Sequence, residues 1–187
     1  MSTFQGLSGG RICLRRWREE DREAFAAMNR DARVMEHFAG LLDRAESDAM
    51  VDGIEKHFSE HGFGLWAIEV PGVAPFIGFA GFAIPRFRAH FTPCVEIGWR
   101  LAFEHWGYGY ATEAARLALG FGFGTLAFSE VVSFTAATNH RSRAVTERLG
   151  MHRDLADDFD HPAFPEGHPL RRHVLYRLRS DSLAAVS

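Results

Sequence analysis

The spacing of apolar residues changes several times along the chain, and each change predicts the start of a different element. Residues 11–17 alternate between apolar and polar side chains, as a half-buried strand does. Residues 46–61 instead place Met50, Ile54 and Phe58 four positions apart, which is the spacing of one helix face. By these criteria the predicted strands cover 11–17, 63–70, 76–84, 94–101, 131–137 and 172–178. The predicted helices cover 19–29, 46–61, 112–121 and 140–151.

The order of these elements predicts one domain of the α/β (α+β) class. A strand and two helices come first, then three strands, a glycine loop with its helix, a strand and helix, and a last strand. We therefore expect a mixed, mostly antiparallel sheet flanked by helices. The chain has no internal repeat and no linker, so residues 1–187 are predicted to form a single domain. Residues 1–10 are small, polar and glycine-rich, and we expect them to be loose.

Composition and charge narrow the classes of partner. The net charge of −3 gives no overall positive field, so nucleic acid and anionic membranes are not expected partners. The apolar runs are short and the N-terminus lacks a leader pattern, which favours a cytoplasmic protein that does not enter a membrane. Cys13 and Cys94 are far apart and form no CxxC pair, so we expect reduced thiols. The oligomeric state is left open between monomer and homodimer.

A pair of glycines, Gly107 and Gly109, stands between a predicted strand and a predicted helix. Four GxG triplets occur in the chain, but only this one has that context. Glycines allow a sharp turn that exposes backbone N–H groups, and the helix that follows adds its positive dipole end, so the loop is a candidate anion site. Thr112 stands where a dinucleotide fingerprint needs its third glycine, and no GK[ST] follows for a P-loop. The structural alternative is a simple connecting turn.

The segment WRLAFEHWGYGYATEA, residues 99–114, resembles the acetyl-CoA-binding motif of the GNAT superfamily of N-acetyltransferases, in the branch related to RimJ and RimL. A second block, ATNHRSRAVTERLGM at 137–151, is similar to the downstream strand and helix of that family. The resemblance implies a GNAT fold, acetyl-CoA as co-substrate and a transferable acetyl group. It also implies a set of cofactor contacts: Leu101 and Phe103 for the pantetheine arm, Trp106, Gly107, Tyr108, Gly109, Tyr110, Ala111 and Thr112 for the pyrophosphate, and Asn139 and Ser142 from the second block.

Two positions depart from the pattern that this resemblance implies. Glu104 opens the glycine loop where many members have Gln or Arg, so a basic phosphate contact is missing there and backbone amides are expected to carry the binding. Thr146 stands where many members have a tyrosine that protonates the leaving thiolate. The proton donor must then be another group, or be dispensable.

Two residues are candidates for catalysis. A primary amine with a pKa of about 10.4 is mostly protonated at neutral pH, so a base is useful, and Glu96 resembles in position the acidic residue that relatives use. Its structural alternative is a solvent-facing carboxylate paired with Arg100. Ser142 matches the family serine that can hydrogen-bond the cofactor sulfur. Its alternative is an ordinary first-turn residue of a helix capped by Asn139.

The acceptor side gives weaker signals. Trp66 and several phenylalanines are candidates to line an acceptor pocket, although aromatic residues are more often core. His161 lies in the loop 156–169, which we interpret as a surface loop or as an acceptor wall whose carboxylates attract a cationic amine. Its Asp and His spacing is irregular, so no metal site is predicted.

These observations predict an enzyme that moves acetyl from acetyl-CoA to a primary amine, either a protein N-terminus or a small molecule. The amine would attack directly in a ternary complex, with Glu96 and Ser142 as catalytic residues and Trp66, Glu96 and His161 near the acceptor. The alternative is a non-catalytic sensor that binds acyl-CoA. No metal is expected in either case.

Overall fold

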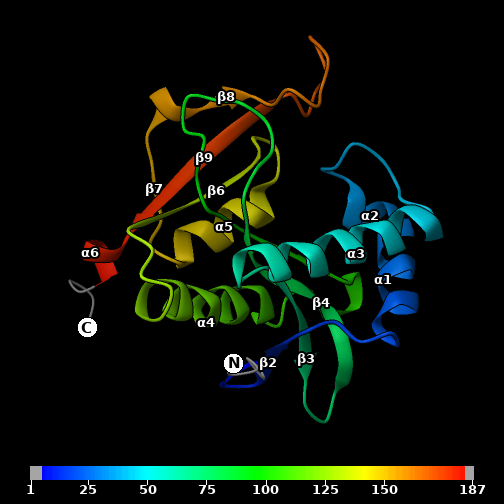
Figure 1. Ribbon diagram of the computed structural model, residues 1–187. Helices are drawn as coiled ribbons and strands as arrows, with labels where there is room; N and C mark the ends of the chain where they lie inside the picture. The colour runs from blue at the N-terminus through cyan, green and yellow to red at the C-terminus, as the bar shows by residue number, and fades with distance from the viewer. Residues whose placement is uncertain (1–5, 184–187) are drawn as a thin grey trace.

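The computed structural model describes residues 6–183 and shows a twisted sheet with helices on both faces (Figure 1). Its strands follow the order β1-β2-β3-β4-β5-β6-β9-β7, with β8 paired to β9. The strands are β1 Leu7–Gly9, β2 Ile12–Arg15, β3 Leu65–Val70, β4 Ala74–Ala83, β5 Glu96–Leu101, β6 Glu130–Ala136, β7 His152–Arg153, β8 Phe159–Asp160 and β9 Arg172–Arg179. The α-helices are α1 Asp21–Arg30, α2 Ala32–Met35, α3 Arg44–His61, α4 Tyr110–Gly124, α5 His140–Arg148 and α6 Ser180–Leu183. Two 3₁₀ turns, η1 Phe103–His105 and η2 Leu155–Asp157, complete the described part of the chain.

The sheet divides at the contact between β5 and β6. On one side β5 pairs with β4 along its whole length, from Ala83↔Glu96 to Gly78↔Leu101. On the other side it meets β6 in parallel at one register position, Glu96↔Val132. The two strands then diverge, and β6 continues antiparallel with β9. The other strand pairs of the described sheet are antiparallel, which confirms the predicted mixed, mostly antiparallel sheet.

Helices cover the sheet through small and aromatic side chains. On one face α4 contributes Ala114, Ala115 and Ala118, all fully buried, to the main core. A second cluster joins Phe25 of α1 and Val34 of α2 to the strands. The small side chains of α4 allow a close helix-to-sheet approach, which holds its N-terminus beside the end of β5.

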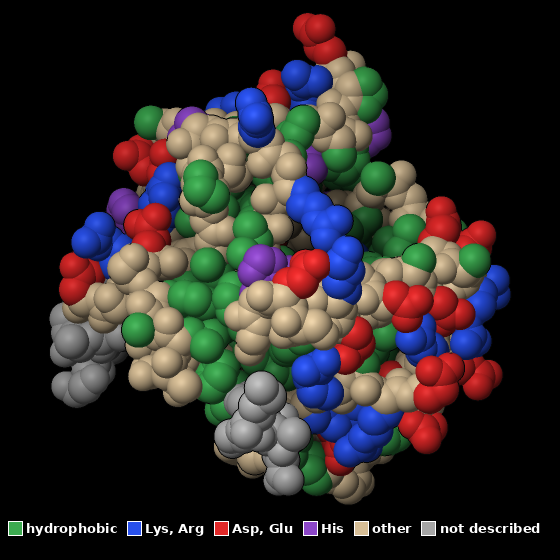
Figure 2. Space-filling model, viewed as in Figure 1, with side chains coloured by type: hydrophobic (Ala, Val, Ile, Leu, Met, Phe, Trp, Pro, Cys, Tyr) green, Lys and Arg blue, Asp and Glu red, His purple; other side chains and the backbone are tan. Residues whose placement is uncertain are grey.

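Local signals explain the ends of α3. Asp43 accepts a hydrogen bond from the Glu46 N–H while the Glu46 carboxylate accepts one from the Asp43 N–H, which forms a capping box. Gly62 ends the helix in the left-handed conformation. On the side of the molecule formed by α1 and α3, acidic and basic side chains are interspersed (Figure 2), and Arg22 forms ion pairs with Glu19 and Asp52 there.

Three parts of the prediction need correction. Residues 1–5 lie outside the described residues, but Leu7–Gly9 is not loose, because it pairs with β2 as an edge strand. The short helix Ala32–Met35 had no periodic signal, since four residues make barely one turn. The loop 156–169 also contains structure, because Phe159–Asp160 adds to the edge of β9. Among the helices of residues 6–183, none is long and apolar enough to cross a membrane.

Candidate functional site

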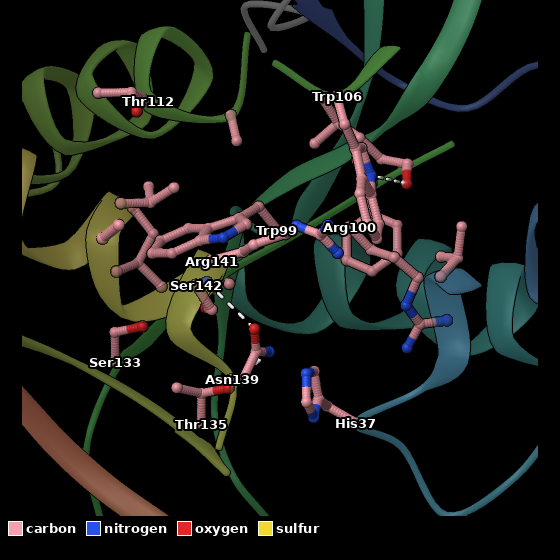
Figure 3. Close-up of a pocket in the computed structure, with 18 of the residues that line it drawn as sticks. His37, Trp99, Arg100, Trp106, Thr112, Ser133, Thr135, Asn139, Arg141 and Ser142 are labelled. Atoms are coloured by element: carbon pink, nitrogen blue, oxygen red, sulfur yellow. Dashed lines mark hydrogen bonds between the residues drawn. The ribbon is translucent and has the colours of Figure 1, made fainter. Parts of the chain in front are cut away.

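A cavity of about 1460 Å³ opens where β5 and β6 diverge. Most of its lining comes from five parts of the chain: α2 with the turn after it, β5, the loop from η1 into α4, the end of β6 with α5, and the segment from His161 to His173. Residues just before β2 and from α3, β3 and β4 complete the lining. Figure 3 labels side chains from the turn after α2, from β5, from the glycine loop with α4, and from β6 with α5 around one space. Asn139 and Ser142 face Arg100 and Trp106 across it. The divergence of the two strands therefore creates the site.

The glycine loop begins α4 in a conformation that leaves its amides unused. Gly107 and Gly109 have φ of 83° and 84°, in the left-handed region that favours glycine. An added Cβ at Gly107 would meet nothing within 4 Å, so the requirement there is for backbone conformation and not for space. No side chain caps α4, and the first backbone hydrogen bond of this helix runs from Glu113 N–H to Gly109 C=O. The N–H groups of the first turn, Tyr110 to Thr112, thus remain available to an anion.

The edge of β5 that faces the gap also presents backbone groups. Val95 C=O accepts from Val132 N–H on one edge at 2.9 Å, and Ala102 N–H donates to Ile77 C=O on the other at 2.9 Å. Because backbone groups of a strand alternate between its two edges, residues 97, 99 and 101 direct theirs toward β6. Beyond Glu96 no described strand pairs with this edge, and Leu101 C=O accepts the Trp106 indole N–H at 2.9 Å. An extended ligand can add to this edge as a strand would.

Basic side chains line the same cavity as the glycine loop, whereas Glu104 is exposed and does not line it. Arg116, Arg141 and Arg148 line it, and no ion pair within the described residues neutralises them. Arg141 lies over the Trp106 ring, 4.7 Å from its centroid. Arginines from α4 and α5 thus add positive charge to the cavity that also contains the loop amides expected to carry phosphate binding.

Arg11 braces the loop from the start of β2. Its guanidinium forms an ion pair with Glu113 at 2.8 Å and donates to the Tyr108 carbonyl at 2.9 Å. Sequence reasoning missed this residue, because it lies 97 positions before Tyr108 and carries no motif of its own. It fixes the loop to the sheet.

Glu96 faces the cavity where β5 and β6 separate. Part of the surface of Glu96 is exposed to the cavity. The surrounding protein nevertheless keeps bulk water away from the carboxyl group, and this desolvation raises its pKa from 4.5 to about 8. No described residue donates a hydrogen bond or forms an ion pair with it. The alternative pairing with Arg100 is absent among the described residues, because Arg100 donates to Asn29 Oδ1 at 2.7 Å. Glu96 is thus a carboxyl group whose pKa is close to physiological pH.

Ser142 lies on the first turn of α5 and also lines the cavity. Asn139 is the N-cap of that helix: its Oδ1 accepts the Ser142 N–H at 3.1 Å and its Nδ2 donates to Thr135 Oγ1 at 3.0 Å (Figure 3). The capping role is therefore real, but it uses the Ser142 amide and leaves the hydroxyl without a hydrogen-bond partner among the described residues. Thr146 does not line the cavity, and its hydroxyl donates to the Arg143 carbonyl at 2.6 Å.

The sequence matches the family described as "Acetyltransferase (GNAT) domain" over residues 11–152. The chain belongs to the GNAT family of acetyltransferases. It is 33% identical over 153 residues to the uncharacterized protein YkkB of Bacillus subtilis, covering 81% of this chain and 88% of YkkB. It is 25% identical to the uncharacterized N-acetyltransferase YoaA of the same organism, covering 81% and 85%. The crystal structure of an acetyltransferase from Agrobacterium tumefaciens superposes with a TM-score of 0.75 at 26% identity, covering 96% of each chain.

Membership in this family makes the chain an acetyl-CoA-dependent acetyltransferase, and the single-domain α/β GNAT fold is confirmed. The family uses acetyl-CoA, and the loop, the free edge of β5 and the arginines form a site whose chemistry suits a long phosphorylated ligand with an extended arm. Among residues 6–183 no group of three or more His, Cys, Asp or Glu side chains could hold a metal ion.

Two predicted contacts do not lie where the sequence placed them. Trp66 is fully buried between Phe58, Phe82 and Phe121 and does not line the cavity, so its predicted role at the acceptor is corrected to one in the core. Phe103 lies in η1, after the strand has ended, with Arg33 stacked on its ring at 3.8 Å. It too is outside the cavity lining, because the chain turns away at Ala102. The other predicted cofactor residues all line the cavity.

Aromatic side chains from β6 and from the segment between His161 and His173 line part of the cavity. We call Phe134, His161, Phe164 and His173 the aromatic wall, and all four line the cavity. The His161 and His173 rings lie 4.7 Å apart. Burial lowers the pKa of His173 to about 4 and also lowers the pKa of His161, so both rings are neutral at pH 7. Sequence reasoning found His161 but missed the other three.

The carboxylates of the loop 156–169 do not face the acceptor. Asp157 forms an ion pair with Arg177 at 2.7 Å, Asp158 with Arg153, and Asp160 with Arg171 at 3.2 Å. None of the three aspartates lines the cavity. The idea that they attract a cationic amine is therefore wrong, because arginines of β7 and β9, and Arg171 just before β9, already neutralise them.

Proposed function

We propose that this chain transfers acetyl from acetyl-CoA to a primary amine by direct attack in a ternary complex. The observation that carries the proposal is the continuity of one cavity, with unused amides and arginines at one end and Glu96 beside the diverging strands at the other. Acetyl-CoA supplies the acetyl group as a thioester. The glycine loop and the edge of β5 are the surfaces suited to its pyrophosphate and its pantetheine arm.

The chemistry at the acceptor needs a neutral amine, and Glu96 is the proposed base. An alkylamine with a pKa of about 10.4 must lose a proton before its nitrogen can attack. A carboxylate whose pKa is about 8 accepts that proton more readily than an ordinary carboxylate does. Glu96 holds this first proton and releases it through the cavity. As the new C–N bond forms and the C–S bond of the thioester breaks, the nitrogen loses its second proton, which the departing thiolate takes up.

The leaving sulfur needs a proton or a hydrogen-bond donor. Ser142 is proposed for this role because its hydroxyl lines the cavity while its amide is held by Asn139. The developing negative charge on the thioester oxygen needs a donor as well, and the free N–H groups along the edge of β5 near Leu101 point into the same gap. Thr146 is unsuited to protonate the thiolate, since it is buried within α5.

The proposal also includes four more specific predictions from the sequence. We propose that the protein belongs to the RimJ/RimL-like branch, acetylates a protein N-terminus or a small molecule, is a monomer or homodimer, and is located in the cytoplasm. The alternative of a non-catalytic sensor predicts that acetyl-CoA binds but that no amine releases its thiol.

Two measurements test the proposal in sequence. A thermal shift with CoA checks the donor site first, and a ligand at 100 times its Kd should stabilise the protein by about 2.7 kcal/mol. Thiol release from acetyl-CoA is then followed with peptides, amino acids, polyamines and aminoglycosides. Stabilisation by CoA without thiol release from any amine favours the sensor, and no stabilisation at saturating CoA overturns the proposal for the donor site.

A further inference from the structure

Arg100 is a buried cation in the cavity that the proposed chemistry does not use. It is 9% exposed, its Nη1 donates to Asn29 Oδ1, and its Nε has no hydrogen-bond partner in the described structure. Its guanidinium lies over the Phe38 ring, 4.0 Å from the centroid. Desolvation lowers its pKa from 12.5 to about 10, and no described carboxylate neutralises it. A buried charge without an opposite charge is costly, and an anion that enters the cavity would relieve this cost.

An open trough connects Arg100 to Glu96. Glu96, Gly98 and Arg100 alternate onto one face of β5, and the strand partner of Gly98 is Gly81. Neither strand therefore places a side chain between the carboxyl and the guanidinium. A Cβ added at Gly98 would meet only Glu96 Oε1, at 3.9 Å, so the space above it is empty. Glu96 and Arg100 are four strand residues apart, so at about 3.3 Å per residue their Cα atoms are separated by about 13 Å.

The Arg100 end of the cavity is short of negative charge. His37 also lines it, and its buried Nδ1 has no hydrogen-bond partner in the described structure. Desolvation lowers the pKa of His37 and Glu36 opposes this shift, while Arg141 and His140 lower the pKa further. Glu36 supplies a carboxyl group at this end, but it is exposed, with its Oε2 3.8 Å from His37 Nε2. A ligand with several positive charges would meet repulsion here, whereas an anionic group would find donors.

We propose that the acceptor is an amine that also carries an anionic group, with its nitrogen at Glu96 and its anion at Arg100. This inference rests on the proposed function and adds the class of acceptor. The flat, forked guanidinium suits a carboxylate or a phosphate, and the length of the trough favours an amine and an anion separated by several bonds. Polyamines and aminoglycosides, which carry several positive charges, are poor acceptors by the same reasoning.

Matched acceptors test the inference. The probes are 6-aminohexanoate and 8-aminooctanoate, each compared with its carboxamide, together with 6-aminohexyl phosphate, which separates a carboxylate from a phosphate preference. We expect the better anionic probe to exceed its neutral counterpart by at least tenfold in kcat/KM, mainly through KM. In Arg100→Gln this preference should disappear while turnover of the neutral amide persists. Arg88→Gln, which changes an exposed arginine outside the cavity, should keep the preference.

A second variant keeps the test decisive if Arg100→Gln proves unstable. Gly98→Val fills the trough, and its added Cβ lies 3.9 Å from Glu96 Oε1, so both probes can lose rate. We expect the ratio of the anionic to the neutral rate to fall to about one, with an unchanged Kd for CoA. Equal rates for anionic and neutral probes in the wild type would overturn the inference alone, as would an equal loss on both probes in Arg100→Gln. Failure of every amine to release thiol would overturn the proposed function and, with it, this inference.

Discussion

The two ends of the cavity are built by different means. At the donor end the binding groups are mostly backbone amides, supplied by a short continuous segment from Trp106 to Thr112 and oriented by two left-handed glycines. At the acceptor end the groups are side chains that come from α2, β5, β6 and the segment before β9. A backbone site can stay the same while side chains vary, whereas a side-chain site changes with every substitution. The first end therefore suits a constant co-substrate, and the second suits a specific acceptor.

The electrostatics of the two ends also differ. Arginines and a helix N-terminus make the donor end positive in a region open to solvent. The acceptor end instead holds a carboxyl whose pKa is raised to about 8, two histidines with lowered pKa values and an unneutralised Arg100. All of these shifts have desolvation as their first cause. In the proposed reaction, charge at the donor end would attract the co-substrate, while burial at the acceptor end would tune proton transfer.

The largest effect is expected from removing the carboxyl of the acceptor end. Glu96→Gln should lower kcat by about 10²- to 10⁴-fold, the usual range for a general base. The wild-type rate should rise with pH and level off above about 8, because Glu96 accepts a proton only after it has lost its own. The kcat is measured at saturating concentrations of an alkylamine, whose pKa of about 10.4 lies well above this range, so that an inflection near pH 8 belongs to the enzyme. In the Gln variant the inflection near pH 8 should vanish.

Glu36→Gln is the matched control for this prediction. Glu36 also lines the cavity, but it is exposed and lies away from the strand divergence. Its replacement should leave the inflection in place. An inflection near pH 8 that survives in Glu96→Gln would show that another group titrates, and the proposed base would be wrong.

A smaller effect is expected from removing one amide at the donor end. Ala111→Pro deletes a single N–H in the first turn of α4, where proline is tolerated. A hydrogen bond to a charged group contributes about 1.5–3 kcal/mol, so the Kd for CoA should rise by about 10- to 100-fold. Ala45→Pro places the same change at the same position of α3, outside the cavity, and should leave the Kd unchanged. An unaltered Kd in Ala111→Pro would mean that this end does not hold the phosphates through its amides.

The contrast between the two ends also explains which parts of the site could be predicted from the sequence. The donor end was predictable because its conformation is encoded locally: glycines between a strand and a helix require a turn that exposes amides, whatever surrounds it. Arg11, His173 and the trough above Gly98 depend on chain segments that meet only after folding, so no spacing indicates them. The same limit explains the wrong prediction for Trp66, because an aromatic residue in a strand gives the same sequence signal whether it packs in the core or lines a pocket. The pairing of Asp160 with Arg171 was likewise invisible before the loop was placed against β9.

The smallest effect is expected where the two ends meet, at Ser142. Its amide belongs to the helix cap and its hydroxyl to the cavity, so Ser142→Ala removes the hydroxyl and keeps the cap. If the hydroxyl stabilises the leaving sulfur, kcat should fall by about tenfold, as loss of one hydrogen bond to a charged group implies, while the Kd for CoA stays the same. Ser133→Ala, which removes another hydroxyl that lines the cavity, serves as the control and should keep kcat. A rise in Kd at constant kcat would assign Ser142 to donor binding, and no change in either constant would leave it as a residue of the cap alone.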